Sequence, residues 1–531
     1  MKRRHLIRLG LLGSAAVFTA RTPGAITSAG LFDVAEVTVT ALQAAMTAGH
    51  LTALALVNAY LARIQAIDRA GPRLNAIIEL NPDARAIAAA LDRERSAHGP
   101  RGPLHGIAVL LKDNIATADR MLTTAGSLAL AGAPAAKDAF LVQQLRDAGA
   151  VILDKTNLSE WANIRSTRAT SGWSTRGGLT RNPYALDRST SGSSSGSGAA
   201  IAASLAAIAV GTETDGSITS PASLAGLVGL KPTRGLISRA GVVPIAPSQD
   251  TPGPMARTVA DAAALLNVLA GSDPQDNATA QAHQRKKDFM KALDKNALMG
   301  KRLGVVRSQF ARHPQQVAAQ VWAAVKVLQA QGAVLVDVPD IPNTDRYAAT
   351  ELTVLLTEFK ASLPRYLATY APRAPVKTLA DVMAFNLQHA DRAMKYFGQE
   401  LFAMAQATDG LGSQDYLEAL AINQQYAGPE GIDAVLAAGQ LDALVAPTGG
   451  LPWLTDLIRG DSSGAGFSSP AAVAGYPHIT VPAGFVQGLP CGLSFVGPAW
   501  SDAALIGMAY AYEQASKYRR APTYPASVNR F

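Results

Sequence analysis

Residues 189–217 read Ser-Thr-Ser-Gly-Ser-Ser-Ser-Gly-Ser-Gly-Ala-Ala-Ile-Ala-Ala-Ser-Leu-Ala-Ala-Ile-Ala-Val-Gly-Thr-Glu-Thr-Asp-Gly-Ser. Two loops rich in Ser, Thr and Gly therefore flank one segment of small and apolar residues, 199–210. Because glycine tolerates positive φ and serine hydroxyls bond nearby backbone, the first loop can bend sharply. The apolar segment predicts a buried helix followed by a buried strand.

The second loop has the composition expected around a serine nucleophile. It ends in Gly216-Ser217-Ile218, and Pro221 follows shortly after. Proline is tolerated in the first turn of a helix, so Ser217 is predicted at the start of one. Backbone N–H groups at a helix start favour negative charge, which suits the oxyanion formed when a serine attacks a carbonyl.

These two loops resemble the motifs of the amidase signature family. Ser193 and Ser217 are 24 residues apart, which matches the family's register. The resemblance extends to segments 111–114 (Leu-Lys-Asp-Asn), 226–233 (Gly-Leu-Val-Gly-Leu-Lys-Pro-Thr), 248–254 (Ser-Gln-Asp-Thr-Pro-Gly-Pro) and 256–258 (Ala-Arg-Thr), with a weaker match at 489–493 (Leu-Pro-Cys-Gly-Leu). Within the family, the sequences of these motifs are most similar to those of bacterial peptide amidases, which remove the C-terminal amide of peptides.

The resemblance implies a Ser–Ser–Lys triad. In this arrangement Ser217 attacks the amide carbonyl, Ser193 bridges it to Lys112, and the peptide bond between Gly192 and Ser193 is cis. Lys112 is the base and must be neutral part of the time. Burial beside the two leucines that precede it is expected to lower its pKa toward roughly 7–8, the range that base catalysis needs.

The resemblance also implies an oxyanion hole and two supporting residues. The hole is expected to consist of the backbone N–H groups of Thr214, Asp215, Gly216 and Ser217. Asn114 and Ser194 are candidates for contact with the substrate. Each also has a structural interpretation, because Asn114 suits a turn or cap and Ser194 suits a hydrogen bond that supports its own loop.

At three positions this chain differs from the residues that are common in the family. Many members have Asp at position 213, Gly at 215 and Arg at 219, where this chain has Glu213, Asp215 and Thr219. Without the Arg, an anchor for a substrate carboxylate is missing, which disfavours small acidic amides. Asp215 adds a carboxylate beside the nucleophile that could accept a hydrogen bond from a substrate N–H.

The resemblance therefore implies a serine amidohydrolase that releases ammonia, with C-terminal peptide amides as the expected substrates. Aryl, alkyl or fatty acyl amides are the alternative, and a role as an amidotransferase subunit is a further one. Candidates for substrate choice are Trp173, Arg176 and Trp453, each of which is equally suited to packing. The expected binding partner is a small-molecule or peptide amide.

One competing motif lies in the first loop. Residues 192–196 satisfy the Gly-x-Ser-x-Gly pattern of the α/β-hydrolases, which would make Ser194 the nucleophile with His389 or His478 as its base. A serine-rich loop matches so short a pattern easily, so we favour the triad. The sequence has no His-Glu-x-x-His and no phosphate-binding loop motif, so we expect neither a metal nor a cofactor.

The wider sequence alternates between strand and helix patterns, which predicts an α/β fold. Strands are predicted at 76–80, 107–111, 151–153, 303–306, 334–338 and 443–446, and helices at 137–148, 157–164, 258–270, 315–331 and 501–517. Thr52 is a predicted N-cap, and 166–191 and 449–469 are predicted loops. The family fold implied is one large twisted mixed β-sheet covered by helices on both faces. We expect a single domain over 30–531, with a core at about 96–270, a helical cover of the site at about 280–436 and a return to the core at 437–531.

The first residues predict export. A basic start with the pair Arg3-Arg4, a short apolar run and small residues are typical of a twin-arginine-type signal peptide within 1–29. We therefore expect a periplasmic or secreted protein with no stable membrane span after processing. Four of the net +8 charges lie in the first eight residues, and the +4 that remains without them does not indicate nucleic-acid binding. The single Cys491 excludes an intrachain disulfide and a cysteine metal cluster.

Overall fold

A computed structural model describes residues 32–528. The predicted signal peptide at 1–29 lies outside these residues, so export stays a prediction. None of the helices within 32–528 is both long and apolar enough to cross a membrane.

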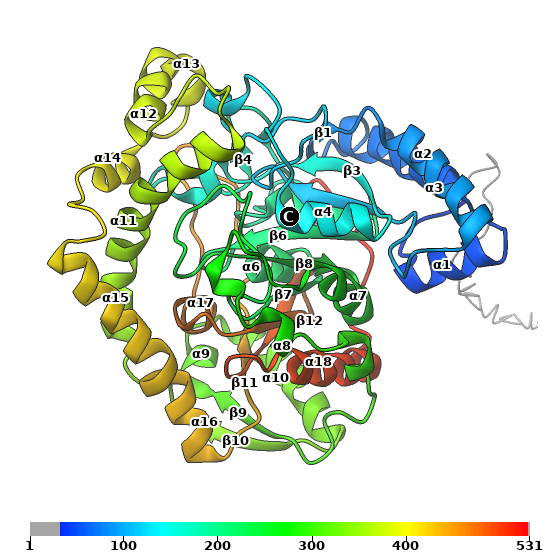
Figure 1. Ribbon diagram of the computed structural model, residues 1–531. Coiled ribbons are helices and arrows are strands. Elements are labelled where there is room, and N and C mark those ends of the chain that lie inside the picture. The colour runs from blue at the N-terminus through cyan, green and yellow to red at the C-terminus, as the bar shows by residue number, and fades with distance from the viewer. Residues whose placement is uncertain (1–31, 529–531) are drawn as a thin grey trace, which may run out of the picture.

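An 11-stranded sheet forms the core, in the order β1-β3-β2-β6-β8-β7-β12-β13-β11-β9-β10 (Figure 1). Its strands are β1 (Ile77–Leu80), β2 (Ala108–Lys112), β3 (Val151–Thr156), β6 (Ile208–Glu213), β7 (Val228–Lys231), β8 (Thr251–Ala256), β9 (Arg302–Val306), β10 (Val334–Val338), β11 (Ala443–Pro447), β12 (His478–Val486) and β13 (Leu489–Val496). β2 pairs in parallel with β3 and β6, and β9 pairs in parallel with β10 and β11. The other neighbouring pairs are antiparallel, so the sheet is mixed, as predicted.

Helices outside residues 344–439 lie around this sheet, and most of them contact its strands. They are α1 (Val39–Thr47), α2 (Ala53–Arg63), α3 (Ala84–His98), α4 (Phe140–Asp147), α5 (Ser195–Ala202), α6 (Thr219–Leu224), α7 (Val259–Leu269), α8 (Ala282–Arg285), α9 (Arg307–Ala311), α10 (Gln315–Ala330), α17 (Ser469–Ala474) and α18 (Asp502–Ser516). α5 contacts β2, β3, β6 and β8, and α10 contacts β11, β12 and β13. The predicted α/β fold class is confirmed.

The region predicted as a helical cover, about 280–436, is helical throughout only in its second part, because β9 and β10 in its first part belong to the sheet. The second part contains α11 (Thr344–Tyr370), α12 (Leu379–Gln388), α13 (Ala390–Ala393), α14 (Glu400–Gln406), α15 (Gln414–Ala427) and α16 (Ala434–Gly439). α11 packs along α15, and Figure 1 shows these helices as an outer arc along one side of the molecule.

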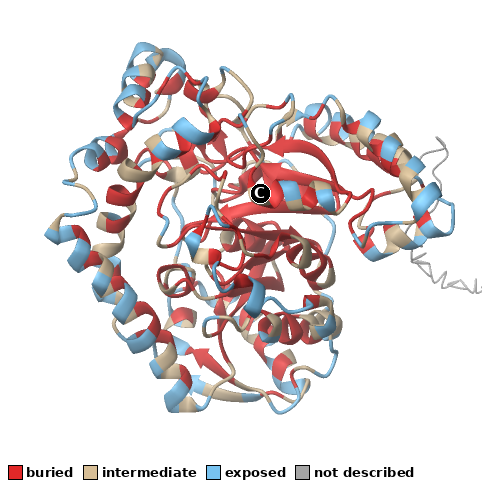
Figure 2. Ribbon diagram, in the orientation of Figure 1, coloured by how far each residue is buried: buried red, intermediate tan, exposed pale blue. Residues whose placement is uncertain are grey.

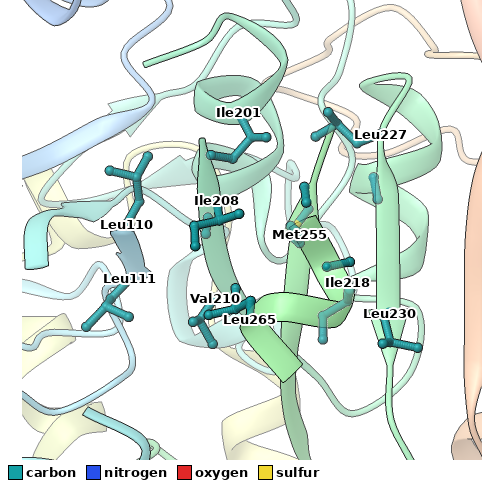
Figure 3. Close-up of a cluster of buried hydrophobic side chains, with 14 of the residues drawn as sticks. Leu110, Leu111, Ile201, Ile208, Val210, Ile218, Leu227, Leu230, Met255 and Leu265 are labelled. Carbon is teal, nitrogen blue, oxygen red and sulfur yellow. The ribbon is translucent and has the colours of Figure 1, made fainter. Parts of the chain in front are cut away.

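The centre of the sheet is buried on both faces. Every residue of β2, β3, β6, β7, β8, β11 and β13 is buried, which explains their nearly continuous apolar runs. Figure 2 shows this buried centre surrounded by helices that are exposed on their outer sides. Figure 3 shows Ile218 among the apolar side chains of this centre, beside Met255 of β8. The residue after Ser217 is thus anchored in the hydrophobic core.

The helix start predicted at Thr52 is confirmed. Thr52 caps α2, since its Oγ1 accepts a hydrogen bond from the Ala55 N–H at 3.0 Å. The loop predicted at 166–191 contains only a short hairpin of β4 (Trp173–Ser174) and β5 (Gly178–Leu179).

The prediction of a helix at 157–164 was wrong. The structure has a short 3₁₀ turn, Glu160–Asn163, in which Trp161 and Ala162 have a left-handed φ of 52°. The backbone of this segment bonds to other parts of the chain: the Ser159 N–H donates to the Ser193 carbonyl oxygen at 3.1 Å, and the Trp161 N–H donates to the Ala125 carbonyl oxygen at 2.9 Å. These contacts with the site loop replace the i→i−4 bonds that a helix requires.

Candidate active site

Lys112 is the last residue of β2 and is fully buried. Its Nζ donates hydrogen bonds to Ser193 Oγ at 2.7 Å, to Thr212 Oγ1 at 2.9 Å and to the Thr212 carbonyl oxygen at 3.1 Å. β2 and β6 are parallel neighbours, so the end of β2 lies beside Thr212 near the end of β6. The sheet register therefore aims the lysine at the first serine loop.

Burial lowers the pKa of Lys112 from 10.5 to about 7, against the opposing pull of the Glu213 and Asp250 carboxylates. Near neutral pH, a substantial fraction of Lys112 is therefore an uncharged amine that can accept a proton. This agrees with the range expected from its sequence environment.

Ser193 follows a cis peptide bond at Gly192–Ser193, as the family resemblance implied. The loop around it is too crowded for a side chain at position 192, because a Cβ there would lie 2.2 Å from Ser159 Oγ. The Ser195 hydroxyl donates to the Ser191 carbonyl oxygen at 2.6 Å and closes the loop. Ser193 itself is fully buried, with its hydroxyl against Lys112.

Ser217 lies in the turn that precedes α6, as predicted, and its carbonyl oxygen accepts a hydrogen bond from the Ser194 N–H at 3.1 Å. This bond joins the two serine loops directly. Ser217 keeps 8% of its surface exposed whereas Ser193 keeps none, so Ser217 is the serine that a substrate can reach. The pair thus suits an exposed nucleophile backed by a buried serine and an amine.

The Glu213 carboxylate holds the turn that carries Ser217. Its Oε2 accepts hydrogen bonds from the Ile218 N–H at 2.7 Å and the Thr219 N–H at 2.9 Å. A carboxylate at this position stabilises the start of α6 and leaves the preceding N–H groups free. In the sequence, Glu213 stood out only as a difference from the Asp that is common in the family, and nothing there indicated this role.

The predicted oxyanion hole has free donors. In the part of the chain that the structure describes, no acceptor receives a hydrogen bond from the backbone N–H of Thr214, Asp215, Gly216 or Ser217. Gly216 has a φ of 73°, a conformation that favours glycine. The assignment of these four groups to an oxyanion stays a prediction, which their free hydrogens support.

Asn114 and Ser194 both bond to Thr212. Asn114 Nδ2 donates to Thr212 Oγ1 at 2.9 Å, the same oxygen that Lys112 contacts. The Ser194 hydroxyl donates to the Thr212 carbonyl oxygen and accepts from the Thr212 N–H, both at 3.2 Å. Both contacts match the structural interpretations, and substrate contact by either residue stays a prediction.

Thr212 was missed in the sequence analysis although it contacts Lys112, Asn114 and Ser194. Thr212 lies near the end of β6, and Thr214 follows just beyond the strand. Thr214 Oγ1 donates to Asp250 Oδ1 at 2.5 Å. In the sequence, nothing marks Thr212 as the residue that contacts Lys112, so sequence reasoning could not have found this role.

The α/β-hydrolase interpretation has no support in these contacts. His478 is buried in β12, with Nε2 2.6 Å from Ser494 Oγ, and burial lowers its pKa to about 3. His389 stacks on Phe385 in the cover. The hydrogen-bond partner of the Ser194 hydroxyl is the backbone of Thr212 rather than a histidine.

The three candidates for substrate choice are all engaged with protein groups. Trp173 packs edge-on against Tyr396 and Phe397. Arg176 pairs with Glu79, and Trp453 Nε1 donates to Asp461 Oδ1 at 3.2 Å. These contacts match the packing interpretation.

Several cavities lie near the site without including the triad, and a small one of about 10 Å³ is lined by Asn114, Thr212, Glu213 and Thr214. One of about 420 Å³ lies between the 239–250 loop and α11, and one of about 110 Å³ lies beside Gln249 and Asn423. Within residues 32–528, no group of three or more His, Cys, Asp or Glu side chains is arranged to hold a metal ion.

Known proteins share both this sequence and this fold. A family model described as "Amidase" matches residues 55–506. A probable amidase of Arabidopsis thaliana is 40% identical over 526 residues, which cover 97% of each chain. The X-ray structure of native peptide amidase from Stenotrophomonas maltophilia is 54% identical with a TM-score of 0.89, covering 93% of this chain and 99% of that one. A structure of the peptide amidase in complex with the competitive inhibitor chymostatin has the same identity and TM-score, covering 92% and 99%.

Proposed function

The chain belongs to the amidase signature family of amide hydrolases, and we propose that it removes the C-terminal amide of peptides and releases ammonia. The observation that carries this proposal is the 54% identity to peptide amidase over 93% of the chain. The Ser–cis-Ser–Lys triad is a property of the family, and we assign its three positions to Ser217, Ser193 and Lys112, which the contact between Lys112 and Ser193 supports.

The proposed reaction begins at Ser217. Its Oγ forms a bond to the amide carbon while its proton passes to Ser193, and the Ser193 proton passes to the neutral amine of Lys112. The negative charge that develops on the carbonyl oxygen is stabilised by the free backbone N–H groups of residues 214–217. The short contact between Lys112 Nζ and Ser193 Oγ supports this route for the proton.

The second half of the reaction returns the proton. The C–N bond breaks, the proton passes from Lys112 through Ser193 to the leaving nitrogen, and ammonia departs from an acyl-enzyme on Ser217. Water then attacks the acyl carbon by the same route, which releases the peptide carboxylate and restores the serine.

Thr219 supports a substrate without a carboxylate near the nucleophile. Its hydroxyl donates to Glu213 Oε2 at 3.2 Å, so the side chain faces the protein. Position 219 carries no positive charge to bind an acidic amide, whereas the negatively chargeable Asp215 stands four residues before it in the chain.

Ammonia release from a C-terminally amidated dipeptide tests the proposal. We expect wild-type protein to release one ammonia per peptide, and Ser217→Ala to lower the rate by about 10³-fold or more, as for other serine nucleophiles. Ser96→Ala, on the exposed surface of α3, is the matched control and should keep wild-type activity. Turnover of anilides or fatty amides without any release from the dipeptide amide would keep the chemistry and refute the peptide substrate.

A further inference from the structure

A second acidic side chain lies next to Asp215, and it comes from the helical cover. Glu351 of α11 is within hydrogen-bonding reach of Asp215, although 136 residues separate them in sequence. Gln249 Nε2 donates to Glu351 Oε1 at 2.8 Å and to the Thr214 carbonyl oxygen at 3.3 Å. The pair is thus fixed beside the turn that carries Ser217.

Two carboxyl groups this close cannot both carry a charge at low cost. Burial and the neighbouring Asp215 raise the pKa of Glu351 to about 8. At neutral pH, Glu351 is therefore predominantly a neutral acid that can donate its proton to Asp215.

Asp215 is held from one side and open on the other. Its Oδ2 accepts a hydrogen bond from the Ser469 hydroxyl at 2.6 Å. Its Oδ1 is buried and receives no hydrogen bond from any N–H or neutral hydroxyl group of residues 32–528. Each carboxylate oxygen has two acceptor sites, so Asp215 retains room for a donor from a ligand even when Glu351 occupies one site.

Two further buried groups at this place lack partners. Tyr347 and Gln249 are each 1% exposed, and within the described residues neither Tyr347 Oη nor Gln249 Oε1 has a hydrogen-bond partner. Tyr347 stands four residues before Glu351 on α11, so the two side chains lie on the same face of the helix. Burial and the Asp215 and Glu351 carboxyl groups raise the pKa of Tyr347. Buried polar groups are normally paired, so several unpaired ones around a single point indicate that a ligand or water completes them.

We propose that Asp215, with Glu351 beside it, binds an N–H group of the substrate next to the scissile bond. Asp215 accepts the hydrogen bond, and Glu351 is a positioning residue that holds Asp215 in place. The inference rests on the proposed function and deepens it. A C-terminally amidated peptide offers two such N–H groups: the scissile carboxamide nitrogen and the peptide nitrogen of the C-terminal residue.

Three substrates separate these two sources. The parent is a capped dipeptide amide, the first analogue is its methyl ester, which lacks the scissile N–H, and the second is the amide with a methyl group on the C-terminal peptide nitrogen. For each enzyme variant, kcat/KM of the parent is divided by kcat/KM of each analogue. Comparing these ratios between variants cancels the intrinsic reactivity of each substrate.

We expect Asp215→Asn to reduce one of the two ratios by about 10- to 100-fold, the size of a lost hydrogen bond to a buried charge. The ratio that falls identifies the N–H that Asp215 binds. Glu351→Ala should reduce the same ratio by about 2- to 10-fold, the size of a neutral hydrogen bond. Glu351→Gln should restore most of that loss, since its amide can donate to Asp215, and such a rescue would not follow if position 351 only filled space.

Asp345→Asn, an exposed carboxylate on the same helix, is the matched control and should leave both ratios unchanged. If both ratios stay at the wild-type value in Asp215→Asn and in Glu351→Ala, the pair is structural and the inference is overturned. If Asp215→Asn fails to fold, the comparison of Glu351→Ala with Glu351→Gln decides in the same way. A wild-type protein that does not hydrolyse the parent amide refutes the proposed function instead.

Discussion

Among residues 32–528, three lysines, Lys112, Lys155 and Lys231, are fully buried, and their hydrogen bonds distinguish Lys112 from the other two. Lys155 Nζ donates to the Ile115 carbonyl oxygen and to Thr123 Oγ1, while Lys231 lies beside the Glu213 and Asp502 carboxylates. Burial lowers the pKa of both to about 8. Lys112 has the lower pKa, about 7, and it alone among the three contacts a serine of the two motif loops.

The pH profile of the reaction should follow Lys112. Its pKa falls to about 7 on burial, and the base must be neutral, so kcat/KM should rise with pH through about 7. Lys112→Arg should lose about 10²–10⁴-fold, because a guanidinium stays protonated. The measurement is kcat/KM for the dipeptide amide from about pH 5 to about pH 9, which spans the pKa of Lys112.

Lys155→Met serves as the control for a buried lysine outside the triad. In this variant, the rise of kcat/KM with pH should stay at the wild-type position even if the protein is less stable. A flat wild-type profile across neutral pH, or an active Lys112→Arg enzyme, would exclude Lys112 as the base.

Individual residues of the site could be predicted where a motif carried them. Lys112, Ser193 and Ser217 stand in recognisable loops, and the structure brings the first two within hydrogen-bonding distance. The sequence also singled out Asp215. It could not have supplied Glu351, because no local pattern marks one glutamate in a long amphipathic helix as the partner of a residue more than 100 positions away.

Among the elements, β3 shows how polar residues can hide a strand. Its apolar start, residues 151–153, predicted only half of it, whereas the buried strand extends through Asp154 and Lys155 to Thr156. β1 and β2 flank it on both sides. Tertiary burial therefore extended the strand past the point where its sequence pattern ended. The failed helix at 157–164 has the same origin, since contacts with distant loops decided its backbone.

Asp154 makes β3 sensitive to pH. Both of its carboxylate oxygens are buried without a hydrogen-bond partner in the described chain, and burial, with Asp68 nearby, raises its pKa well above the usual value. A carboxyl whose pKa is higher in the folded state stabilises the fold at pH values below its unfolded pKa. This stabilisation is lost as the pH rises through the folded pKa.

Asp154→Asn should therefore flatten the loss of stability on the alkaline side. We expect the variant to gain about 1–3 kcal/mol in the free energy of unfolding relative to wild type at alkaline pH, since it avoids ionising a buried group, and to gain less in acid. Thermal or urea unfolding across the pH range measures this difference. Asp147→Asn, an exposed carboxylate on α4, should change nothing with pH. Parallel pH curves for wild type and Asp154→Asn would contradict a neutral Asp154.

Over the whole molecule, function depends on how the helical cover is attached to the sheet domain. Figure 1 shows α11 to α15 as an arc beside the core. The contacts that fasten this arc include the bond from Gln249 to Glu351, the bond from the Ser248 N–H to Glu358 at 2.8 Å, and the contacts of Arg165. A helical cover was predicted for about 280–436, and the helices of this arc fall within it. The arc's points of attachment could not be predicted, because each joins residues more than 100 positions apart.

Arg165 is the buried link between the loop after β3 and the far end of the cover. Its guanidinium pairs with Glu160 at 2.7 Å and donates to the carbonyl oxygens of Ala393 at 2.6 Å and Phe397 at 3.3 Å. It also lies over the ring of Phe397 at 4.2 Å. Both charged side chains are at most 1% exposed, so removing one leaves the other charge buried without its partner.

Arg165→Met should therefore destabilise the protein by about 3–5 kcal/mol and release the segment that contains α12 to α14. We expect a lower unfolding temperature and faster proteolytic cleavage within 379–406. The double variant Glu160→Gln/Arg165→Met should recover part of the stability, because the unpaired carboxylate is gone. Arg373→Met removes an exposed arginine that donates to the Pro134 carbonyl oxygen, and it should leave cleavage unchanged. Equal cleavage rates in Arg165→Met and wild type would show that Arg165 does not fasten the cover, and its attachment would then rest on α11 alone.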